Sequence, residues 1–315
     1  MSDSREPAVS VVIPCYNYGR YLSQTLDSVL GQTFADWEIV IVDDGSTDDS
    51  SAVAQAFIDR HPDRHIRLLR QANAGVSAAR NAGIKASTGR YILPLDADDV
   101  IAPTMLEKTA AALNTDPHIA IASTDLFIFT DADSLTPQVL ELPPYSKELL
   151  LQRLIMFYCS LYRREAWQAV GGYNEHMRAG EDWDFWIGCA ELGFDAHHIP
   201  EPLFGARNKD TGLHVEAAEN DLAVRAQIVA NHPTSFKPLT QAWAHALLNQ
   251  EHDACQYDTR VPDEILSRAV EMDQFLRVTM DLQRMARLQH YRIKHLEKTL
   301  ADQTTPSPAE PITIA

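Results

Sequence analysis

Short apolar runs alternate with stretches of helical periodicity over the first 125 residues of the 315-residue chain. Five runs have the length and composition of buried strands, at residues 9–14, 37–42, 66–69, 91–95 and 119–123. Between them, apolar residues recur every three or four positions, which predicts helices around residues 22–30, 52–58, 76–86 and 105–113. This alternation predicts an α/β fold, a Rossmann-like, mostly parallel sheet with helices on both faces.

Polar side chains follow three of the predicted strands at the point where each strand ends. Tyr16 and Asn17 come after the first strand, Asp43 and Asp44 after the second, and the sequence Asp-Ala-Asp-Asp, residues 96–99, after the fourth. Ligands of parallel α/β sheets bind beyond the carboxyl ends of the strands. We therefore expect one crevice to gather the three clusters.

The rest of the chain has a different pattern. Residues 143–208 are less regular, and from residue 215 the chain reads as helical. Residues 303–315 are rich in proline and have little to bury, which predicts a disordered tail. The expected organisation is an α/β domain over residues 1–214, a helical C-terminal extension over residues 215–302, and the tail.

Composition narrows the functional classes. The chain carries 44 Asp and Glu against 27 Lys and Arg, a formal charge of -17 that would repel a nucleic-acid backbone, so nucleic acid is not an expected partner. There is no signal-like apolar core at the N-terminus and no run of about 18 apolar residues, so we expect a cytoplasmic protein. The scattered cysteines are typical of free thiols in a reducing compartment: Cys15, Cys159, Cys189 and Cys255.

The acidic turn at residues 96–99 is the first candidate for chemistry. Asp96 and Asp98 can present oxygens to Mg²⁺ or Mn²⁺, which typically take one or two protein carboxylates and fill the shell with phosphate oxygens and water. The alternative is an acidic loop that complements the dipole of the next helix. Asp44 is equally ambiguous, because it could accept hydrogen bonds from a base or ribose, or could form a turn and helix cap.

Arg80 lies on a predicted helix that is lined by Ala and Gly, which lets the helix backbone approach the sheet closely. A guanidinium buried there would be costly without an anionic partner. A pyrophosphate or one of the acidic clusters would satisfy it. The alternative is a structural ion pair with Asp43 or Asp96.

Glu181, Asp182 and Asp184 open a further predicted helix. Acidic residues in a first helical turn usually complement the dipole, but a carboxylate there could also act as a base toward a hydroxyl group. The neighbouring aromatic side chains could form an apolar wall, a platform for a ring, or core: Trp183, Phe185 and Trp186. The sequence leaves open whether any of three histidines contacts a metal: His197, His198 and His214.

Taken together and in order, these segments resemble family 2 glycosyltransferases, which have the GT-A nucleotide-sugar-binding fold. The resemblance covers about residues 8–200. It rests on the segments at residues 11–17, 32–34, 42–48, 73–83, 96–99, 171–173 and 180–184. No single segment is decisive, but the ordered set is highly specific.

The resemblance implies a role for each matched position. Asp182 is implied to be the catalytic base. Asp98 is implied to bind the metal, Mn²⁺ or Mg²⁺, together with the diphosphate. The positions implied to bind the donor are Pro14, Tyr16, Asn17, Asp44, Arg80, Asp96, Ala97 and Asp98. Within this set, Tyr16 and Asp44 are implied to contact the nucleotide base. Secondary roles are implied for Glu181, Asp184 and Arg207.

The activity implied by the resemblance is transfer of a sugar, with inversion, from a nucleotide diphosphate sugar to a hydroxyl of a saccharide or lipid-linked acceptor. Such chemistry serves cell-surface polysaccharide or glycolipid synthesis. The alternative is a catalytically inactive nucleotide-sugar-binding or scaffold protein with the same fold. A nucleotidyltransferase or a dinucleotide dehydrogenase would need a Gly-rich loop after the first strand, where this chain has residues 14–17, Pro-Cys-Tyr-Asn.

Two positions depart from the family pattern. Gly188 stands where many relatives carry Arg, and Arg207 is interpreted as the remnant of a basic loop that closes over the donor. Beyond the resemblance, basic residues and an apolar stripe between residues 277 and 300 predict a helix. That helix could pack on the catalytic domain or form a homodimer, or it could bring the protein to the inner face of an anionic membrane.

Overall fold

The computed structural model describes residues 7–130, 137–209, 221–249 and 279. The chain divides into two units, Met1–Ser235 and Phe236–Ala315, and the first contains the whole described sheet. The boundary predicted from the sequence lies at residue 214. The predicted tail, the basic helix near the C-terminus, His214 and Cys255 lie outside the described residues.

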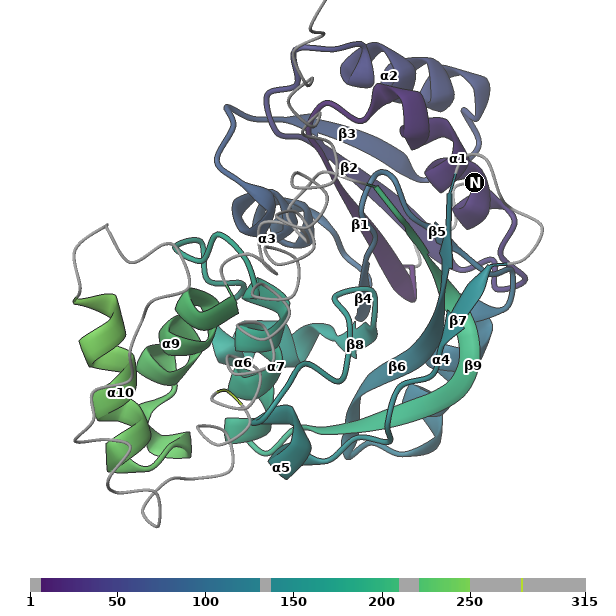
Figure 1. Ribbon diagram of the computed structural model, residues 1–315. Coiled ribbons are helices and arrows are strands. Elements are labelled where there is room, and N and C mark those ends of the chain that lie inside the picture. The colour runs from purple at the N-terminus through teal and green to yellow at the C-terminus, as the bar shows by residue number, and fades with distance from the viewer. Residues whose placement is uncertain (1–6, 131–136, 210–220, 250–278, 280–315) are drawn as a thin grey trace, which may run out of the picture. The chain divides into compact units, whose positions relative to one another are not determined.

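The described strands form one nine-stranded sheet in the order β3-β2-β1-β4-β8-β6-β9-β5, with β7 paired to β6 (Figure 1). Their bounds are β1 Val9–Cys15, β2 Trp37–Asp43, β3 Ile66–Arg70, β4 Tyr91–Pro94, β5 Val100–Ile101, β6 Ile119–Phe129, β7 Gln138–Leu140, β8 Leu161–Arg163 and β9 Asp195–Arg207. The pairings among β3, β2, β1 and β4 are parallel, as is the long pairing of β6 with β9. The antiparallel pairings involve two or three residues each, so the expected mostly parallel sheet is confirmed.

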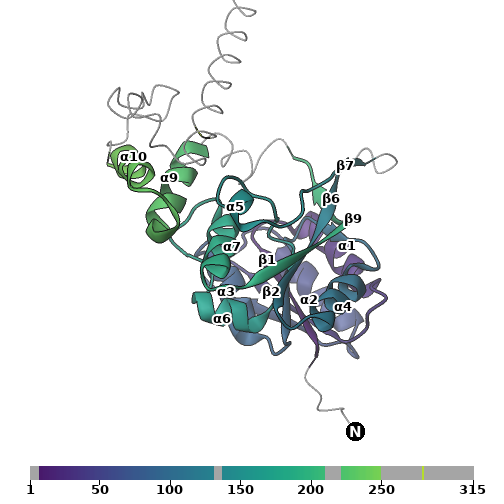
Figure 2. The ribbon, with the colours of Figure 1, turned by 90° about the horizontal axis from the view of Figure 1, so that it is seen from below.

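Helices cover both faces of this sheet. The first unit contains α1 Gly19–Leu30, α2 Ser50–Arg60, α3 Val76–Ala86, α4 Met105–Thr115, α5 Lys147–Leu150, α6 Arg164–Val170, α7 Glu181–Glu191 and α9 Asp221–Asn231, and the second contains α10 Pro238–Leu248. Figure 2 shows α1, α2 and α4 on one side of the sheet and α3, α6 and α7 on the other. The four helices predicted between the first five strands are all present.

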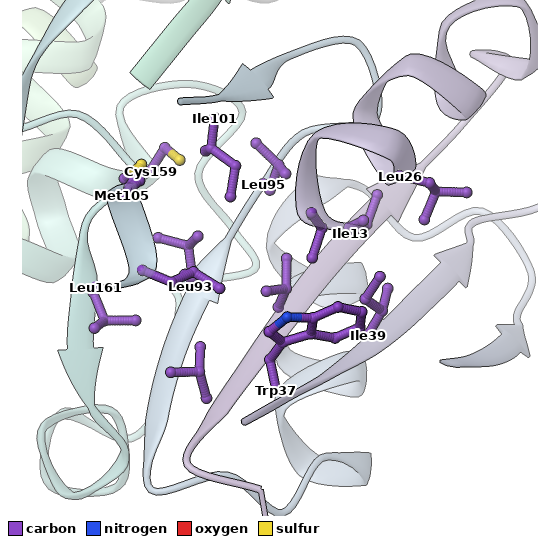
Figure 3. Close-up of a cluster of buried hydrophobic side chains, with 14 of the residues drawn as sticks. Ile13, Leu26, Trp37, Ile39, Leu93, Leu95, Ile101, Met105, Cys159 and Leu161 are labelled. Atoms are coloured by element: carbon purple, nitrogen blue, oxygen red, sulfur yellow. The ribbon is translucent and has the colours of Figure 1, made fainter. Parts of the chain in front are cut away.

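The main core lies between the sheet and α1, α2 and α4. Figure 3 shows Leu26 of α1 beside Ile13 and Ile39 of the sheet, and Met105 of α4 near Leu93. All five side chains are fully buried. Burial of one such side chain stabilises the fold by roughly 1.5–3 kcal/mol, so this face secures the parallel strands whose ends carry the polar clusters.

Helix α3 covers the opposite face at short range. Ala79 packs against Val40 and Val42 of β2. A Cβ atom placed on Gly83 would lie 2.4 Å from a methyl carbon of Val12, so a larger residue there would push the helix off the sheet. The prediction that small residues let this helix pack closely is confirmed.

The segment at residues 143–208 has more structure than its pattern indicated, since it contains α5, β8, α6 and β9. Strand β9 runs for 13 residues alongside β6. Its first eight residues are all at least partly exposed and include Pro200 and Pro202, and the register with β6 shifts near Asp125. Prolines and weak alternation are the opposite of a strand signal, which is why the pattern did not reveal β9. None of the described helices is long and apolar enough to cross a membrane.

Candidate functional site

The carboxyl ends of β1, β2 and β4 meet at one edge of the sheet, and the three polar clusters follow from them. Cys15 is opposite Asp43 in the parallel register of β1 and β2. The backbone N–H of Asp44 donates to the carbonyl of Cys15 at 2.9 Å, and the N–H of Leu95 donates to the carbonyl of Val12 at 2.9 Å. The register therefore places the loops that begin at residues 16, 44 and 95 together, as expected from the sequence.

Asp44 connects the end of β2 to the beginning of α3. Its carboxylate accepts hydrogen bonds from the backbone N–H groups of Ala74 and Gly75, both at 2.9 Å, and from the side-chain amide of Gln71 at 2.7 Å. Gly75 has a φ of 91°, which only glycine adopts readily. Asp44 thus fixes the turn before α3, and Gln71 is a partner that the sequence analysis did not identify.

Tyr16 and Asn17 differ in their surroundings. The side chain of Tyr16 is 45% exposed, so its ring is accessible to a ligand. Asn17 has a φ of 60°, and its side-chain oxygen accepts from the backbone N–H of Thr47 at 2.7 Å while its own N–H donates to Ser46 at 3.0 Å. Asn17 therefore connects the loops after β1 and β2 and orients the residue before it.

Pro14 and Ala97 are buried parts of the same edge. Pro14 lies in β1 opposite Val42. The carbonyl of Ala97 accepts a hydrogen bond from the hydroxyl of Thr25 at 2.9 Å. These two residues shape the backbone of this edge of the sheet, and the charged groups come from their neighbours.

Arg80 is the centre of an acidic cluster. Its guanidinium is buried and binds Asp96 at 2.8 Å and Glu181 at 2.6 Å, so it connects α3, the acidic turn and α7. The predicted ion pair with Asp96 is confirmed, whereas Asp43 accepts from the backbone N–H of Ser46 at 2.9 Å. Burial alone would lower the pKa of Arg80, but the charges of Asp96 and Glu181 raise it well above its ordinary value. Arg80 is therefore a permanent cation.

Asp182 is the second residue of α7 and follows Glu181 directly. Burial, together with the charge of Glu181, raises the pKa of Asp182 to about 7, although Arg80 acts in the opposite direction. One carboxylate oxygen accepts a hydrogen bond from the backbone N–H of Trp183 at 2.8 Å. A carboxylate with a pKa near 7 is well suited to accept a proton at neutral pH.

The aromatic residues beside Asp182 belong to the core. Trp183 is 4% exposed, Phe185 is 1% exposed and Trp186 is fully buried. The indole N–H of Trp183 donates to the carbonyl of Leu150 at 2.7 Å. The structure thus favours the core and apolar-wall interpretations over a platform for a ring, and the wall contributes to the desolvation that raises the pKa of Asp182.

Asp98 is buried in the acidic turn and forms an ion pair with Lys209. The ammonium of Lys209 also donates to the hydroxyl of Tyr18 at 2.7 Å. Burial alone would lower the pKa of Lys209, but the hydrogen bonds to Asp98 and Tyr18 raise it, so the group stays charged. Neither Lys209 nor Tyr18 was among the site residues predicted from the sequence.

Arg207 holds this turn in place. Its backbone N–H donates to a carboxylate oxygen of Asp99 at 2.8 Å, and its guanidinium donates to the carbonyl of Asp98 at 2.8 Å. Val100 of β5 is opposite Gly205 of β9 in an antiparallel register, so each step back from Val100 meets a step forward from Gly205. That register brings residues 207–209 to the acidic turn. Because the pairing belongs to the folded sheet, the sequence pattern could not reveal Lys209.

The carboxylate oxygens of the acidic turn fit a hard divalent cation that uses few protein ligands. In the part of the chain that the structure describes, no cluster of three or more His, Cys, Asp or Glu side chains could hold a metal ion. His198 binds Asp125 at 3.0 Å and Ser123 at 3.2 Å, and His197 is exposed. The carboxylate of Asp98 pairs with the ammonium of Lys209, so its position suits a cation. One such carboxylate is enough for Mg²⁺ or Mn²⁺, because these ions take most of their ligands from phosphate and water.

Asp184 lies in α7 but faces α9. It accepts hydrogen bonds from the side-chain amide of Asn231 at 2.6 Å and from His232 at 3.2 Å, and His232 also contacts Glu191 at 2.9 Å. A side chain on Gly188, where many relatives carry Arg, would meet Val170 at 3.1 Å. This side of α7 is therefore packed against the fold.

We expect the contact between α7 and α9 to weaken as the pH rises. Burial lowers the pKa of His232, but the hydrogen bonds to Asp184 and Glu191 outweigh it and raise the pKa above the ordinary 6.5. The stabilisation is complete below about pH 6.5 and is lost as the pH rises through the raised value. In urea titrations the destabilisation caused by His232→Gln should be largest at pH 5.5 and should shrink above pH 7. An equal destabilisation at pH 5.5 and pH 8.5 would contradict this.

Comparison with known proteins agrees with this geometry. Residues 10–171, just over half of the chain, match the model of glycosyl transferase family 2. The chondroitin synthase of Escherichia coli is 32% identical over 189 residues, which are 60% of this chain and 27% of that protein. The hyaluronan synthase of Pasteurella multocida is 30% identical over 194 residues, 62% of this chain and 20% of that protein. The chain therefore spans about a quarter or less of these relatives.

Solved structures of glycosyltransferases share the fold, among them the following two. A mannosyltransferase from Pyrobaculum calidifontis, in complex with GDP-Man and Mn²⁺, superposes with a TM-score of 0.59 at 20% identity and covers 94% of this chain and 84% of its own. TarS of S. aureus, residues 1–349 in complex with UDP-GlcNAc, gives a TM-score of 0.56 at 20% identity, over 71% of this chain and 66% of that one. The GT-A fold expected from the resemblance is confirmed.

Proposed function

The chain belongs to glycosyl transferase family 2, and on that premise we propose that it transfers a sugar from a nucleoside diphosphate sugar to a hydroxyl acceptor, with inversion and with Mn²⁺ or Mg²⁺ as cofactor. The observation that carries the proposal is the carboxyl group of Asp182, which is buried beside Glu181 and has a pKa of about 7. Asp182 comes within the electrostatic reach of Arg80, which in turn binds Asp96 of the acidic turn.

The donor occupies the edge where β1, β2 and β4 end. The exposed ring of Tyr16 stacks near the base. Asp44 is held by hydrogen bonds from the beginning of α3 and positions the base or ribose. Asp98 would hold the divalent cation together with the diphosphate. The chemistry that the bound ion would supply is neutralisation of the charge on the leaving diphosphate.

Asp182 acts as the base. It removes the proton from the acceptor hydroxyl as the hydroxyl oxygen attacks the anomeric carbon from the face opposite the diphosphate. The bond to the acceptor oxygen forms as the bond to the diphosphate oxygen breaks, so one displacement inverts the configuration. A double displacement would need a second carboxylate as nucleophile, whereas Glu181 is engaged by Arg80 and Asp184 by Asn231.

The acceptor is a saccharide in this proposal, and the product belongs to cell-surface polysaccharide. Support comes from the relatives, among which are chondroitin and hyaluronan synthases. Because the chain spans 27% and 20% of these proteins, their full activities are not transferred to it. The rival is an inactive nucleotide-sugar-binding protein, which would bind donor and Mn²⁺ but would release no nucleoside diphosphate on incubation with donor and saccharide acceptors.

The metal assignment has a direct test. Asp98→Asn removes the charge at the proposed metal ligand, so Mn²⁺ should no longer increase the affinity for UDP or GDP in calorimetric titrations, while the far-UV circular dichroism spectrum without ligands stays that of the wild type. Asp27→Asn, an exposed site on α1, makes the same chemical change away from the acidic turn and should keep the Mn²⁺ effect. A wild-type Mn²⁺ effect in Asp98→Asn would place the metal at another residue.

A further inference from the structure

The ammonium of Lys209 contacts the carboxylate of Asp98, the residue proposed as the metal ligand. Its ammonium forms an ion pair with Oδ2 of Asp98, and the two side chains are 15% and 9% exposed. The same ammonium donates to the hydroxyl of Tyr18 at 2.7 Å and lies 4.1 Å from the centre of the Tyr18 ring. A cation so placed neutralises the carboxylate in an environment with little water.

The two basic side chains at the end of β9 are held in different ways. The guanidinium of Arg207 is buried, donates to the carbonyl of Asp98 at 2.8 Å and to the side chain of Gln24 at 2.5 Å, and lies 4.4 Å from the centre of the Tyr21 ring. Arg207 is therefore a fixed part of the fold. Lys209 carries a compact point charge on a four-carbon chain with several rotatable bonds, so it can change partners without a change in the backbone.

Asp98 cannot serve Lys209 and a divalent cation at the same oxygen. Mg²⁺ requires its carboxylate oxygen at roughly 2.0–2.1 Å, and a neighbouring ammonium in hydrogen-bond contact with that oxygen would be repelled. An ammonium released next to a diphosphate gains a strong new partner, because charge-assisted bonds to phosphate oxygens are about twice as strong as neutral ones.

We propose that Lys209 is an exchangeable counter-ion: it pairs with Asp98 until a divalent cation takes that carboxylate, and it then binds the diphosphate of the donor. The proposal rests on the proposed function for the cation and the diphosphate. Its consequence is that Lys209 opposes the binding of metal alone and favours the binding of nucleotide with metal, so the two ligands bind cooperatively.

Lys209→Met tests both halves by calorimetry, without reference to activity. Titration of the nucleotide-free protein with Mn²⁺ alone should show an affinity on the order of tenfold higher than wild type, because the competing ammonium is gone. Titration with UDP, and with GDP in parallel, at saturating Mn²⁺ should show an affinity about tenfold lower, because a charge-assisted bond to the diphosphate is lost. Effects of opposite sign from one substitution are not produced by general destabilisation.

Two control variants separate the specific effect from net charge and from folding. Lys108→Met, on α4, removes the same charge from a partly exposed pair with Glu201 of β9, and both affinities should stay at wild-type values. Lys209→Arg keeps the charge and should bind Mn²⁺ as weakly as wild type.

An Mn²⁺ affinity of Lys209→Met equal to or below that of the wild type overturns the exchange at Asp98. An unchanged nucleotide affinity of Lys209→Met overturns the transfer of Lys209 to the diphosphate. If the wild type binds neither nucleotide at any Mn²⁺ concentration, the proposed function fails, and the Mn²⁺ titration still decides the exchange.

Discussion

Asp182→Asn is expected to lower the rate of sugar transfer by ~10²–10⁴ while donor affinity stays near that of wild type. The amide has the shape of the carboxyl group and keeps an oxygen for the backbone N–H of Trp183, but it cannot accept a proton from the acceptor. Initial rates measured by release of nucleoside diphosphate, with donor binding measured by calorimetry, separate the two effects. A wild-type rate would move the base to Glu181 or Asp184.

The pH dependence should identify the same residue. Because the pKa of Asp182 is about 7, kcat/KM of the wild type should rise with pH and level off above that value. The residual activity of Asp182→Asn should lack this acidic limb.

The same pKa has a consequence for stability. A carboxyl group whose pKa is raised from 3.8 to about 7 by folding contributes stability below pH 3.8 that is lost as the pH rises to about 7. Asparagine cannot ionise, so Asp182→Asn should melt at a higher temperature than wild type at pH 8, with a smaller difference at pH 5. A variant less stable than wild type at pH 8 would contradict the assigned pKa. Asp184→Asn is the matched variant, because Asp184 accepts hydrogen bonds from Asn231 and His232. It should show no such gain in melting temperature.

The parallel half of the sheet could be predicted because its signals are local. The strands from Val9, Trp37, Ile66 and Tyr91 begin where the apolar runs begin. Those from Val9, Trp37 and Tyr91 are buried on both faces, which makes their hydrophobicity continuous. The edge at which Asp44 and the acidic turn meet then follows from the direction of the strands.

The contacts that complete the site could not be predicted in the same way. Arg80 binds Glu181 across 101 positions of sequence, and Lys209 reaches Asp98 through the short pairing of β5 with β9. That pairing involves two residues in each strand, and β9 lacks the alternation that marks strands. A carboxylate in a first helical turn looks the same whether it complements a dipole, as Asp184 could, or is desolvated in a site, as Asp182 is. Both residues are buried, so their partners decide between them: Asp184 contacts Asn231 and His232, whereas Asp182 lies beside Glu181. Those partners are set by the tertiary fold.

Arg80→Met is expected to destabilise the protein by about 3–5 kcal/mol, the usual cost of removing one partner from a buried ion pair. The methionine fills much of the volume between Tyr158 and Tyr173, so the loss is mainly electrostatic. It leaves Asp96 and Glu181 without the cation that both bind. Urea titrations at pH 7.5 measure the change in the free energy of unfolding.

A double variant separates this electrostatic cost from lost packing. Glu181→Gln removes one of the carboxylates left uncompensated, so Arg80→Met combined with Glu181→Gln should be more stable than Arg80→Met alone, although Glu181→Gln by itself removes an ion pair from the wild type. A double variant as unstable as the sum of the single ones would mean that Arg80 acts through packing. Where Arg80→Met does not fold, Arg80→Lys serves instead. Lysine keeps the charge but cannot contact both carboxylates as the guanidinium does, so its free energy of unfolding should fall between those of the wild type and Arg80→Met.

Arg80 also lowers the pKa of Asp182, so any weakening of that charge should move the acidic limb of kcat/KM to higher pH. A loss of stability without that movement would place Arg80 in the fold but outside the electrostatics of the base.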